Sequence, residues 1–566
     1  MPLKNWEVAA ILTRIGQLLA LQEDKPFKSR AYARAARSIQ RLDEDVEAYH
    51  RKGALTRIAG VGRNIGDKIR EILETGESSY LKKLEARFPG DFLDVLAVPG
   101  VGLATGRLLY QHLNVASLKD VERAVDNREV RKIPGLGPKT EQRLKEGLRL
   151  MQDSPKVFNL GFIAPLAREI ELNLNSLDFV EQAAAGGGFR RRAEAVSSLD
   201  FVISSREREK VAPYLEKQAF IREVRAKGQV IEALSLWQLP LSFYLVKPED
   251  FWSSLLWVTG SKDHLDELAA LAASGGLEIS REIFQEGEGE FYRRLGCPWI
   301  PPELREGRGE VEAALKGELP SLVSLADIRG DLHTHSSWSD GTESIRNMAL
   351  KAREKGYSYM AVTDHSQSLK IAGGLTPGEL EQQVREINRL KEDFSGFTIL
   401  TGMEVDIKKD GTLDLPDSVM EGLDLVVASI HTGFKQPGEQ LTRRMMAAME
   451  NPHVDIIGHP TGRLIGRRAP YPVDVNAVLH KAAETGKVLE INASPDRLDL
   501  KDVYVQKGRE LGVKFAVNTD THSAVGLNDM EFGVAAARRG WLEAEDVINT
   551  YDIDRLKSVL NKGGRH

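Results

Sequence analysis

The chain has 566 residues, a formal net charge of −6 and a single cysteine, Cys297. This length exceeds what one hydrophobic core supports, so we expect roughly three to five domains. One cysteine excludes an intramolecular disulfide and a thiolate-held metal cluster. The sequence also contains no run of about 18 apolar residues, which argues against a membrane partner and predicts a cytoplasmic protein.

Charge is unevenly divided along the chain. Residues 1–150 carry 27 Lys and Arg against 20 Asp and Glu, whereas the remaining residues carry 50 against 63. A basic segment of this kind is typical of a polyanion-binding region. The acidic remainder is free to use its carboxylates for another purpose.

Three segments of the basic region share one pattern, an apolar helix end followed by Gly-x-Gly and a new amphipathic helix. They read LTRIAGVGRNIGDKI (55–69), VLAVPGVGLATGRLL (95–109) and VRKIPGLGPKTEQRL (130–144). The pattern resembles the helix-hairpin-helix motif of DNA repair proteins. Such glycines expose amide hydrogens at a helix N-terminus, where a phosphate oxygen can bind. An ordinary glycine-capped turn would explain one copy, but three copies predict DNA-backbone binding at Gly60, Gly62, Gly100, Gly102, Gly135 and Gly137.

The segment GGGFRRRAEAVSSLDF (186–201) combines three glycines with three arginines. Glycine lets backbone amides approach a phosphate closely, and guanidinium groups neutralise its charge. We therefore expect Gly187, Arg190 and Arg191 to bind phosphate. Metal-assisted phosphoryl transfer usually requires neighbouring carboxylates, and the run SSLDF offers only Asp200.

Between residues 331 and 522, short apolar strand-like runs alternate with helical patterns, and most of these runs end in a residue that can bind a metal. This alternation predicts a parallel βα barrel, whose active site forms at the carboxyl ends of the strands. A residue in the loop SSWSDG joins the set. The candidate ligands are His333, His335, Asp340, His365, Glu404, His431, His459, Asp520 and His522.

The spacing of these residues favours a metal centre over ordinary packing histidines. His333 and His335 lie two residues apart on a strand, so their rings leave the same face, and Asp520 and His522 repeat the arrangement. Six of the twelve histidines of the chain fall at strand ends in this region. Arg463 follows His459 closely, where it could hold a flanking phosphate or lie in a surface loop.

The motifs HTHSSWSDG, TDHS, GME, SIHTGF, GHPTGRLIGRR and NTDTHS resemble the ligand set of the polymerase and histidinol phosphatase (PHP) domain, in the form attached to bacterial family X DNA polymerases. The resemblance covers residues 325–566 and implies a distorted (βα)7 barrel with up to three divalent metals. One metal would take His333, His335, Glu404 and Asp520. A second would share Glu404 and add His431 and His459, and a third would take Asp340, His365 and His522. Imidazole and carboxylate ligands suit Mn²⁺ or Zn²⁺.

The remaining chain resembles the polymerase part of the same family. The resemblance implies a helical, lyase-like domain at residues 1–80 and fingers with two hairpins at 81–150. Residues 151–320 would form a nucleotidyltransferase-like α+β palm and thumb. Lys68 matches the Schiff-base lysine of DNA polymerase beta, although Asn64 stands where that protein has another lysine.

The palm departs from the family pattern. The family has three metal-binding aspartates, and in this chain Ser198 and Ser242 stand at two of these positions, so that only Asp200 remains as a catalytic candidate. Neutral hydroxyls substitute poorly for charged ligands of Mg²⁺. We therefore expect weak or absent polymerisation, with Mg²⁺ as a cofactor only if polymerisation persists.

Together these features predict a monomeric DNA repair enzyme that acts on gapped, nicked or 3′-end duplex DNA. The expected reaction is metal-dependent phosphoester hydrolysis as a 3′-5′ exonuclease, with abasic-site endonuclease or 3′-phosphatase activity as related reactions. One alternative is an active gap-filling polymerase with a proofreading nuclease. Another is a non-catalytic DNA-binding scaffold with structural metals.

Overall fold

The computed structural model describes residues 4–20, 26–40, 42, 44–87, 92–98, 101–153, 157–275 and 287–560. The chain forms two compact units. The first consists of Met1–Phe158, Ile163–Gly186 and Ser197–Leu255, and the second of Asn159–Phe162, Gly187–Val196 and Leu256–His566. Most of the glycine- and arginine-rich segment, Gly187–Val196, thus belongs to the same unit as the predicted barrel.

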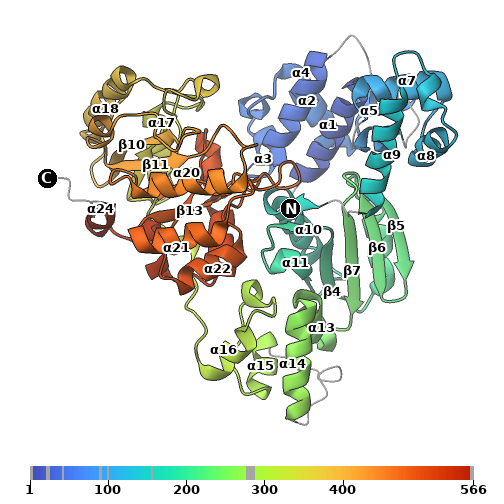
Figure 1. Ribbon diagram of the computed structural model, residues 1–566. Coiled ribbons are helices and arrows are strands. Elements are labelled where there is room, and N and C mark those ends of the chain that lie inside the picture. The colour runs from blue at the N-terminus through green and yellow to red at the C-terminus, as the bar shows by residue number, and fades with distance from the viewer. Residues whose placement is uncertain are drawn as a thin grey trace. The chain divides into compact units, whose positions relative to one another are not determined.

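Helices make up the N-terminal part of the first unit (Figure 1). Their buried apolar faces, which include Leu12, Ile39 and Ile69, share one hydrophobic core. The bounds are α1 Asn5–Ala20, α2 Pro26–Gln40, α3 Val46–Arg51, α4 Arg63–Thr75, α5 Ser79–Glu85, α6 Phe92–Ala97, α7 Leu103–Leu113, α8 Leu118–Asp126 and α9 Pro138–Asp153. This arrangement agrees with the predicted series of hairpins.

A five-stranded sheet completes the first unit, in the order β2-β4-β7-β6-β5. Its strands are β2 Gln182–Ala185, β4 Leu199–Ser204, β5 Ile221–Lys227, β6 Val230–Ser235 and β7 Pro240–Val246. The central strands β4 and β7 are parallel, and Phe201 stacks on Phe243 between them. Burial alternates along β7, so apolar side chains face the core and Ser242 lies on the opposite face.

The palm-like region also contains helices α10 Leu160–Asn175, α11 Gly187–Arg190 and α12 Val211–Leu215, and the pair of short strands β1 Phe158–Asn159 and β3 Ala195–Val196. Four further helices follow in chain order, α13 Phe251–Thr259, α14 Lys262–Ser274, α15 Glu288–Arg294 and α16 Glu310–Lys316. A buried polar network crosses the last three of these: the ring of His264 lies 2.7 Å from Glu310 Oε1 and 3.0 Å from the Tyr292 hydroxyl.

Seven strands form the parallel sheet of the second unit in unbroken chain order, from β8 to β14. They are β8 Gly330–Asp331, β9 Tyr359–Val362, β10 Thr398–Asp406, β11 Leu425–Ser429, β12 Ile456–Ile457, β13 Val488–Asn492 and β14 Phe515–Asn518. A bridge between Thr334 and Thr521 joins the continuations of the first and last strands and nearly closes the barrel. The predicted parallel barrel of seven strands is confirmed.

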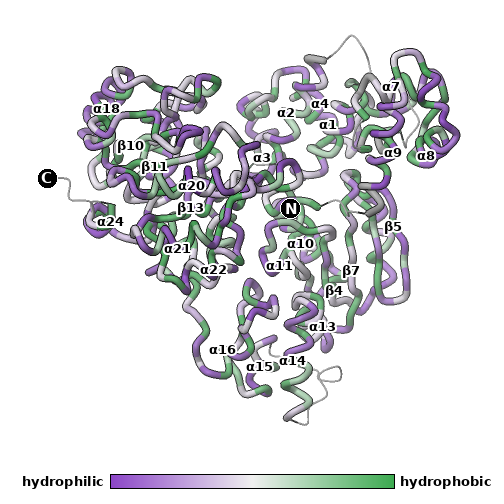
Figure 2. Tube along the Cα trace, in the orientation of Figure 1, coloured by the Kyte–Doolittle hydropathy of each residue, from purple (hydrophilic) through white to green (hydrophobic). Residues whose placement is uncertain are grey.

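Helices cover the outside of this barrel (Figure 1). They are α17 Ile345–Glu354, α18 Pro377–Lys391, α19 Asp417–Met420, α20 Gly438–Glu450, α21 Val475–Thr485, α22 Asp502–Glu510, α23 Met530–Arg539 and α24 Ile553–Leu560. In helices such as α21 and α22, hydrophobic residues recur between hydrophilic ones (Figure 2). Such helices bury one face against the strands, because an apolar stripe at helical spacing excludes water from the core.

Candidate metal centre and nucleic-acid interface

The nine predicted ligands come together at the carboxyl ends of six of the seven barrel strands. His333 and His335 follow β8, His365 follows β9, Glu404 lies in β10, and the other strand-end ligands follow β11, β12 and β14. Parallel strands end at the same edge of a barrel, so residues far apart in sequence meet there.

Glu404 lies at the centre of this group and is buried. Its Oε1 atom lies 3.2 Å from His431 Nε2 and 3.1 Å from His459 Nε2. Its Oε2 atom lies 2.7 Å from His365 Nδ1 and 3.5 Å from His333 Nε2. His335 Nε2 lies 3.7 Å from the same Oε2 atom, so one carboxylate faces five imidazole rings.

Asp520 and Asp340 are the other two carboxylates that contact imidazole rings in this group. Asp520 Oδ1 lies 3.1 Å from His335 Nε2 and 3.6 Å from His333 Nε2. Asp340 Oδ1 lies 3.2 Å from His522 Nε2 and 3.6 Å from His365 Nε2. The rings of His335 and His522 are stacked with their centroids 4.2 Å apart.

Among the described residues, three sets of side chains place one ligand atom each within 4.8 Å of one another. The sets are His335, Asp340, His365 and His522; His333, His335 and Asp520; and His365, Glu404 and His431. Each metal group implied by the family resemblance overlaps one of them. The sets share His335 and His365, which places the candidate positions side by side.

The chemistry of these side chains fits divalent metal ions. Two ligands that each lie about 2.0–2.3 Å from one metal lie roughly 3–4 Å apart, and most of the distances above fall in this range. Several buried atoms in the group have no hydrogen-bond partner, among them His333 Nε2 and Glu404 Oε2. Buried polar atoms are normally paired, so the convergence of these unpaired atoms suits a site for a cation.

The electrostatics of the group favour ionised carboxylates. Burial opposes ionisation of Glu404, but the neighbouring His431, His333 and His365 outweigh it and hold the pKa of this carboxyl well below its usual range. Burial likewise disfavours a charged His431, yet Glu404 and Asp406 raise its pKa to about 10. This concentration of buried opposite charge is typical of a functional site.

Glu490 is a functional residue that the sequence prediction missed. Its Oε1 atom lies 2.7 Å from His333 Nδ1, and its Oε2 atom accepts a hydrogen bond of 2.7 Å from the backbone amide of His459. It thereby orients two ligands, a role that carboxylates often take behind metal-bound histidines. The available signal was its place near the end of the apolar run VLEIN, where a carboxylate otherwise has no reason to be buried.

The palm sheet places Asp200 beside a hydroxyl instead of a second carboxylate. Asp200 on β4 is the direct partner of Ser242 on β7, whose partner on β6 is Glu232. The Glu232 carboxylate pairs with Lys227 at 2.7 Å. Ser198 precedes β4 by one residue. The described sheet thus pairs Asp200 with a hydroxyl, as the sequence alignment implies.

The hairpin glycines divide into two kinds. Gly60 and Gly135 have φ angles of +78° and +86°, which only glycine adopts readily. Gly62 and Gly102 precede α4 and α7, where no side chain caps the first amides of the helix. A Cβ atom at Gly62, Gly102 or Gly137 would meet nothing within 4 Å, so each helix N-terminus is open to a ligand. Gly100 lies outside the described residues.

Comparison with known proteins gives a consistent result for every part of the chain that matches. Residues 3–78 match the model of a helix-hairpin-helix domain, and residues 92–150 match a SAM-like helix-hairpin-helix tandem. Residues 254–306 match the DNA polymerase beta thumb, and residues 331–494 match the PHP domain.

One curated relative decides the family. The DNA polymerase/3′-5′ exonuclease PolX of Bacillus subtilis (strain 168) is 37% identical over 569 residues, which cover 98% of this chain and 99% of the relative. The chain belongs to the family X DNA polymerases with a C-terminal PHP domain. It is therefore an enzyme whose family combines nucleotidyltransferase and phosphoesterase activities.

The PHP part of this family X polymerase also resembles separate proteins. Probable phosphatases of Thermoanaerobacter sp. (strain X514) and of Aeromonas hydrophila are 32% and 30% identical over 246 residues, or 42% of the chain and 95% of each relative. The barrel thus matches almost the whole length of proteins that lack the other parts. Among the described helices of the polymerase, we find none long and apolar enough to cross a membrane.

The arginines predicted to bind phosphate contact carboxylates of the family X polymerase itself. Arg190 donates to both oxygens of Glu288, at 2.6 and 2.9 Å, and Arg191 donates to Glu306 at 2.9 Å. Arg463 donates to both carboxylate oxygens of Glu194, and the longer of these bonds is 3.2 Å. These contacts hold the guanidinium groups in internal ion pairs, and their phosphate-binding role stays a prediction.

Lys68 lies on α4 with its ammonium group over the ring of Tyr80, 5.5 Å from the ring centroid. Tyr80 in turn stacks on Tyr32, with centroids 6.3 Å apart. The lysine is half-buried beside these rings. Its lyase role stays a prediction.

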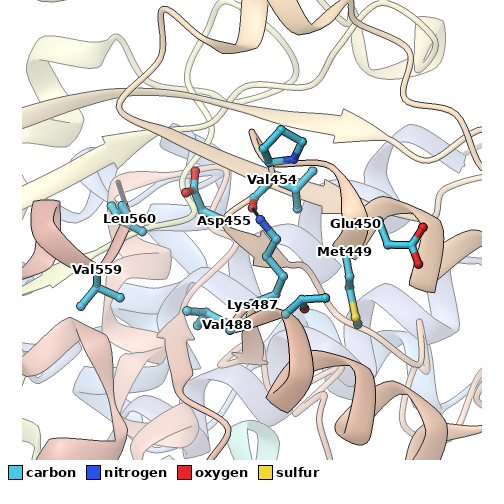
Figure 3. A pocket seen from close by; sticks show the side chains of 11 residues that line it. Met449, Glu450, Val454, Asp455, Lys487, Val488, Val559 and Leu560 are labelled. Carbon is cyan, nitrogen blue, oxygen red and sulfur yellow. Dashed lines mark hydrogen bonds between the residues drawn. The ribbon is translucent and has the colours of Figure 1, made fainter. Parts of the chain in front are cut away.

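A pocket of about 370 Å³ is lined by residues that include Asp455 and Lys487 (Figure 3). Asp455 and Lys487, which line it, precede β12 and β13, whereas the ligands follow the strands. Lys487 Nζ donates to the Val454 carbonyl across the pocket at 2.6 Å. This pocket is separate from the candidate metal centre.

Proposed function

We propose that this family X polymerase is a DNA repair enzyme that acts mainly as a 3′-5′ exonuclease. The observation that carries the proposal is the contrast between its two candidate centres. Nine ligands converge in the barrel, whereas the palm keeps one of three carboxylate positions. The barrel would therefore hydrolyse the phosphoester bonds. Because its substrate is DNA, the enzyme would work in the cytoplasm.

The hairpins would hold the DNA. Their open helix N-termini offer backbone amides to phosphate oxygens without contacting bases, so binding should be independent of sequence. This supports a gapped, nicked or 3′-end duplex as the substrate. We propose a monomer, because one chain supplies both the hairpins and every candidate ligand.

Up to three Mn²⁺ or Zn²⁺ ions would be held by His333, His335, Asp340, His365, Glu404, His431, His459, Asp520 and His522. When bound, such ions lower the pKa of a water molecule and neutralise charge on a phosphodiester. The protein keeps the ligand rings oriented through Glu490 and excludes bulk water by burying Glu404 and His333.

Polymerisation should be weak or absent, because Asp200 and two hydroxyls cannot balance two Mg²⁺ ions beside a triphosphate. The name of the Bacillus subtilis relative favours the alternative of an active gap-filling polymerase with a proofreading nuclease. The probable phosphatases favour 3′-phosphatase activity, and abasic-site cleavage would use the same chemistry. The remaining alternative is a scaffold with structural metals.

The nuclease is tested with a 5′-labelled strand that has a free 3′ end, in Mn²⁺. Wild-type protein should shorten the strand, and His333→Ala or Asp520→Asn should stop the reaction. Asparagine suits position 520, since Asp520 has a φ of +52° and asparagine tolerates that conformation. Equal degradation by wild type and both variants would rule out the barrel as the nuclease.

The palm is tested with a one-nucleotide gapped duplex, dNTPs and Mg²⁺ or Mn²⁺. We expect little templated extension by wild-type protein and no further loss in Asp200→Ala. Strong extension that Asp200→Ala abolishes would establish the gap-filling alternative instead.

A further inference from the structure

Arg497 lies beside the candidate metal centre, in the loop that follows β13, the one barrel strand that supplies no predicted ligand. Its Nε atom is 3.6 Å from Asp520 Oδ2. The other oxygen of that carboxylate, Oδ1, faces His335 at 3.1 Å. A cationic side chain therefore stands on the far side of a ligand carboxylate, among residues that already favour positive metal ions.

The guanidinium group of Arg497 is only partly satisfied by the ion pair with Asp520. It carries five N–H donors, yet its side chain makes no hydrogen bond within 3.5 Å to the described residues, and the buried Nη1 atom has no partner. Buried donors are normally satisfied. The side chain is 20% exposed, so the group lies at the edge of the centre and not sealed in a core. The Nη1 atom of Arg497 can therefore donate a hydrogen bond to a bound ligand.

Other interactions hold the Arg497 loop in place. Arg463 Nε donates to the Arg497 carbonyl at 2.9 Å, and Arg463 Nη2 donates to the Leu498 carbonyl. Arg463 is itself fixed by Glu194, which accepts from Nη2 at 2.7 Å and from Nη1 at 3.2 Å. Arg463, which the sequence analysis suggested for phosphate binding, thus contacts and positions the backbone of Arg497.

We propose that Arg497 binds the phosphoryl group of the substrate at the metal centre. A planar guanidinium matches two phosphate oxygens, and a phosphoryl group is the anion that the proposed phosphoesterase must hold there. The inference rests on the proposed function and adds a substrate-binding residue to it. In this proposal Arg463 and Glu194 act as positioning residues, because their contacts hold the Arg497 loop in place.

The test measures the binding of inorganic phosphate to the Mn²⁺-loaded full-length protein by calorimetry, with manganese content measured in parallel. Arg497→Met should weaken phosphate binding by about 10- to 100-fold, since charge-assisted hydrogen bonds are lost. Arg497→Lys keeps the charge without the planar fork and should fall between wild type and the methionine variant. Arg443→Met, at an exposed arginine on α20 paired with Glu439, is the matched control and should bind like wild type.

Both Arg497 variants should retain the manganese content and thermal stability of wild type. If they bind phosphate as wild type does, or if wild type binds none, the inference is overturned. Loss of manganese in the lysine variant would also overturn it, by assigning Arg497 to the support of Asp520. The proposed nuclease is judged separately, because its failure would appear as intact phosphate binding without shortening of DNA.

Discussion

Glu490 contacts the His333 ring at Nδ1, and we expect the negative charge of this carboxylate to strengthen metal binding by the ring. Glu490→Gln keeps the size of the side chain but lowers the basicity of the imidazole. We expect Mn²⁺ affinity to fall by about 10- to 100-fold, a usual effect of removing such a partner. Metal titration followed by elemental analysis would measure it. Unchanged affinity in a folded variant would show that His333 needs no such support.

Restoring negative charge at Ser198 and Ser242 should restore metal binding in the palm. The Ser198→Asp and Ser242→Asp double variant should raise templated nucleotide incorporation above wild type in Mg²⁺, because Ser242 is the direct partner of Asp200 across β4 and β7. Primer extension on the gapped duplex measures this gain. An active wild-type enzyme that the double variant fails to improve would show that hydroxyls suffice at these positions.

The sequence predicted individual ligands better than their supporting contacts. Most of the candidate ligands lie at the end of a recognisable apolar strand, so local pattern was enough to nominate them, whereas Asp340 lies in a loop. Arg190, Arg191 and Arg463 show the limit. Their partners lie far away in sequence, 269 residues away for Glu194 and Arg463. Local charge indicated phosphate binding, which stays a prediction, but it could not indicate these carboxylate partners.

At the scale of elements, the open hairpins give a clean mutational test. In Gly62→Val the new Cβ atom would meet no atom within 4 Å apart from those of its chain neighbours, and the backbone has an ordinary φ of −82°. The helix should persist, while a DNA phosphate would meet the new methyl groups. We expect DNA affinity to fall by about 10-fold for every sequence, the worth of a lost hydrogen bond or two. Fluorescence anisotropy would measure it, and circular dichroism would confirm folding.

The matched change at the first glycine of the same hairpin serves as the contrast. A Cβ at Gly60 would approach Arg34 Cδ to 2.9 Å, and its φ of +78° would be strained. Gly60→Val should therefore lower thermal stability as well as DNA binding. Normal DNA affinity in the folded Gly62→Val variant would refute the role of this hairpin.

The helices α11 and α15 are joined by a buried ion pair that predicts a pH dependence. Burial alone would raise the pKa of Glu288, but Arg305 and Arg190 lower it to about 2. The folded value thus lies below the unfolded one, so the stabilisation is present above about pH 4.5 and is lost as the pH falls towards 2. It amounts to about 3 kcal/mol.

Glu288→Gln should consequently lower the thermal midpoint strongly at pH 7 and much less at pH 3. Thermal unfolding of both proteins across this range measures the difference. A difference that stays constant with pH would show that the ionised carboxylate does not contribute as described.

At the scale of the whole molecule, the helix-hairpin-helix region and the barrel could be predicted because repeated motifs and alternating strands extend over long stretches. The division into two units could not. The segment Gly187–Val196 belongs with the second unit, although β4 directly after it belongs to the first. The contacts of this segment with the second unit include the ion pair of Arg191 with Glu306, which no local pattern reveals.

We propose that this family X polymerase mainly removes nucleotides and adds few or none. The most direct test is the length of a 5′-labelled primer in a one-nucleotide gap when the protein receives Mn²⁺ and all four dNTPs together. We predict a shorter primer with wild type and with Asp200→Ala, and an unchanged primer with His333→Ala. A primer lengthened by wild type and by His333→Ala, but not by Asp200→Ala, would contradict the account.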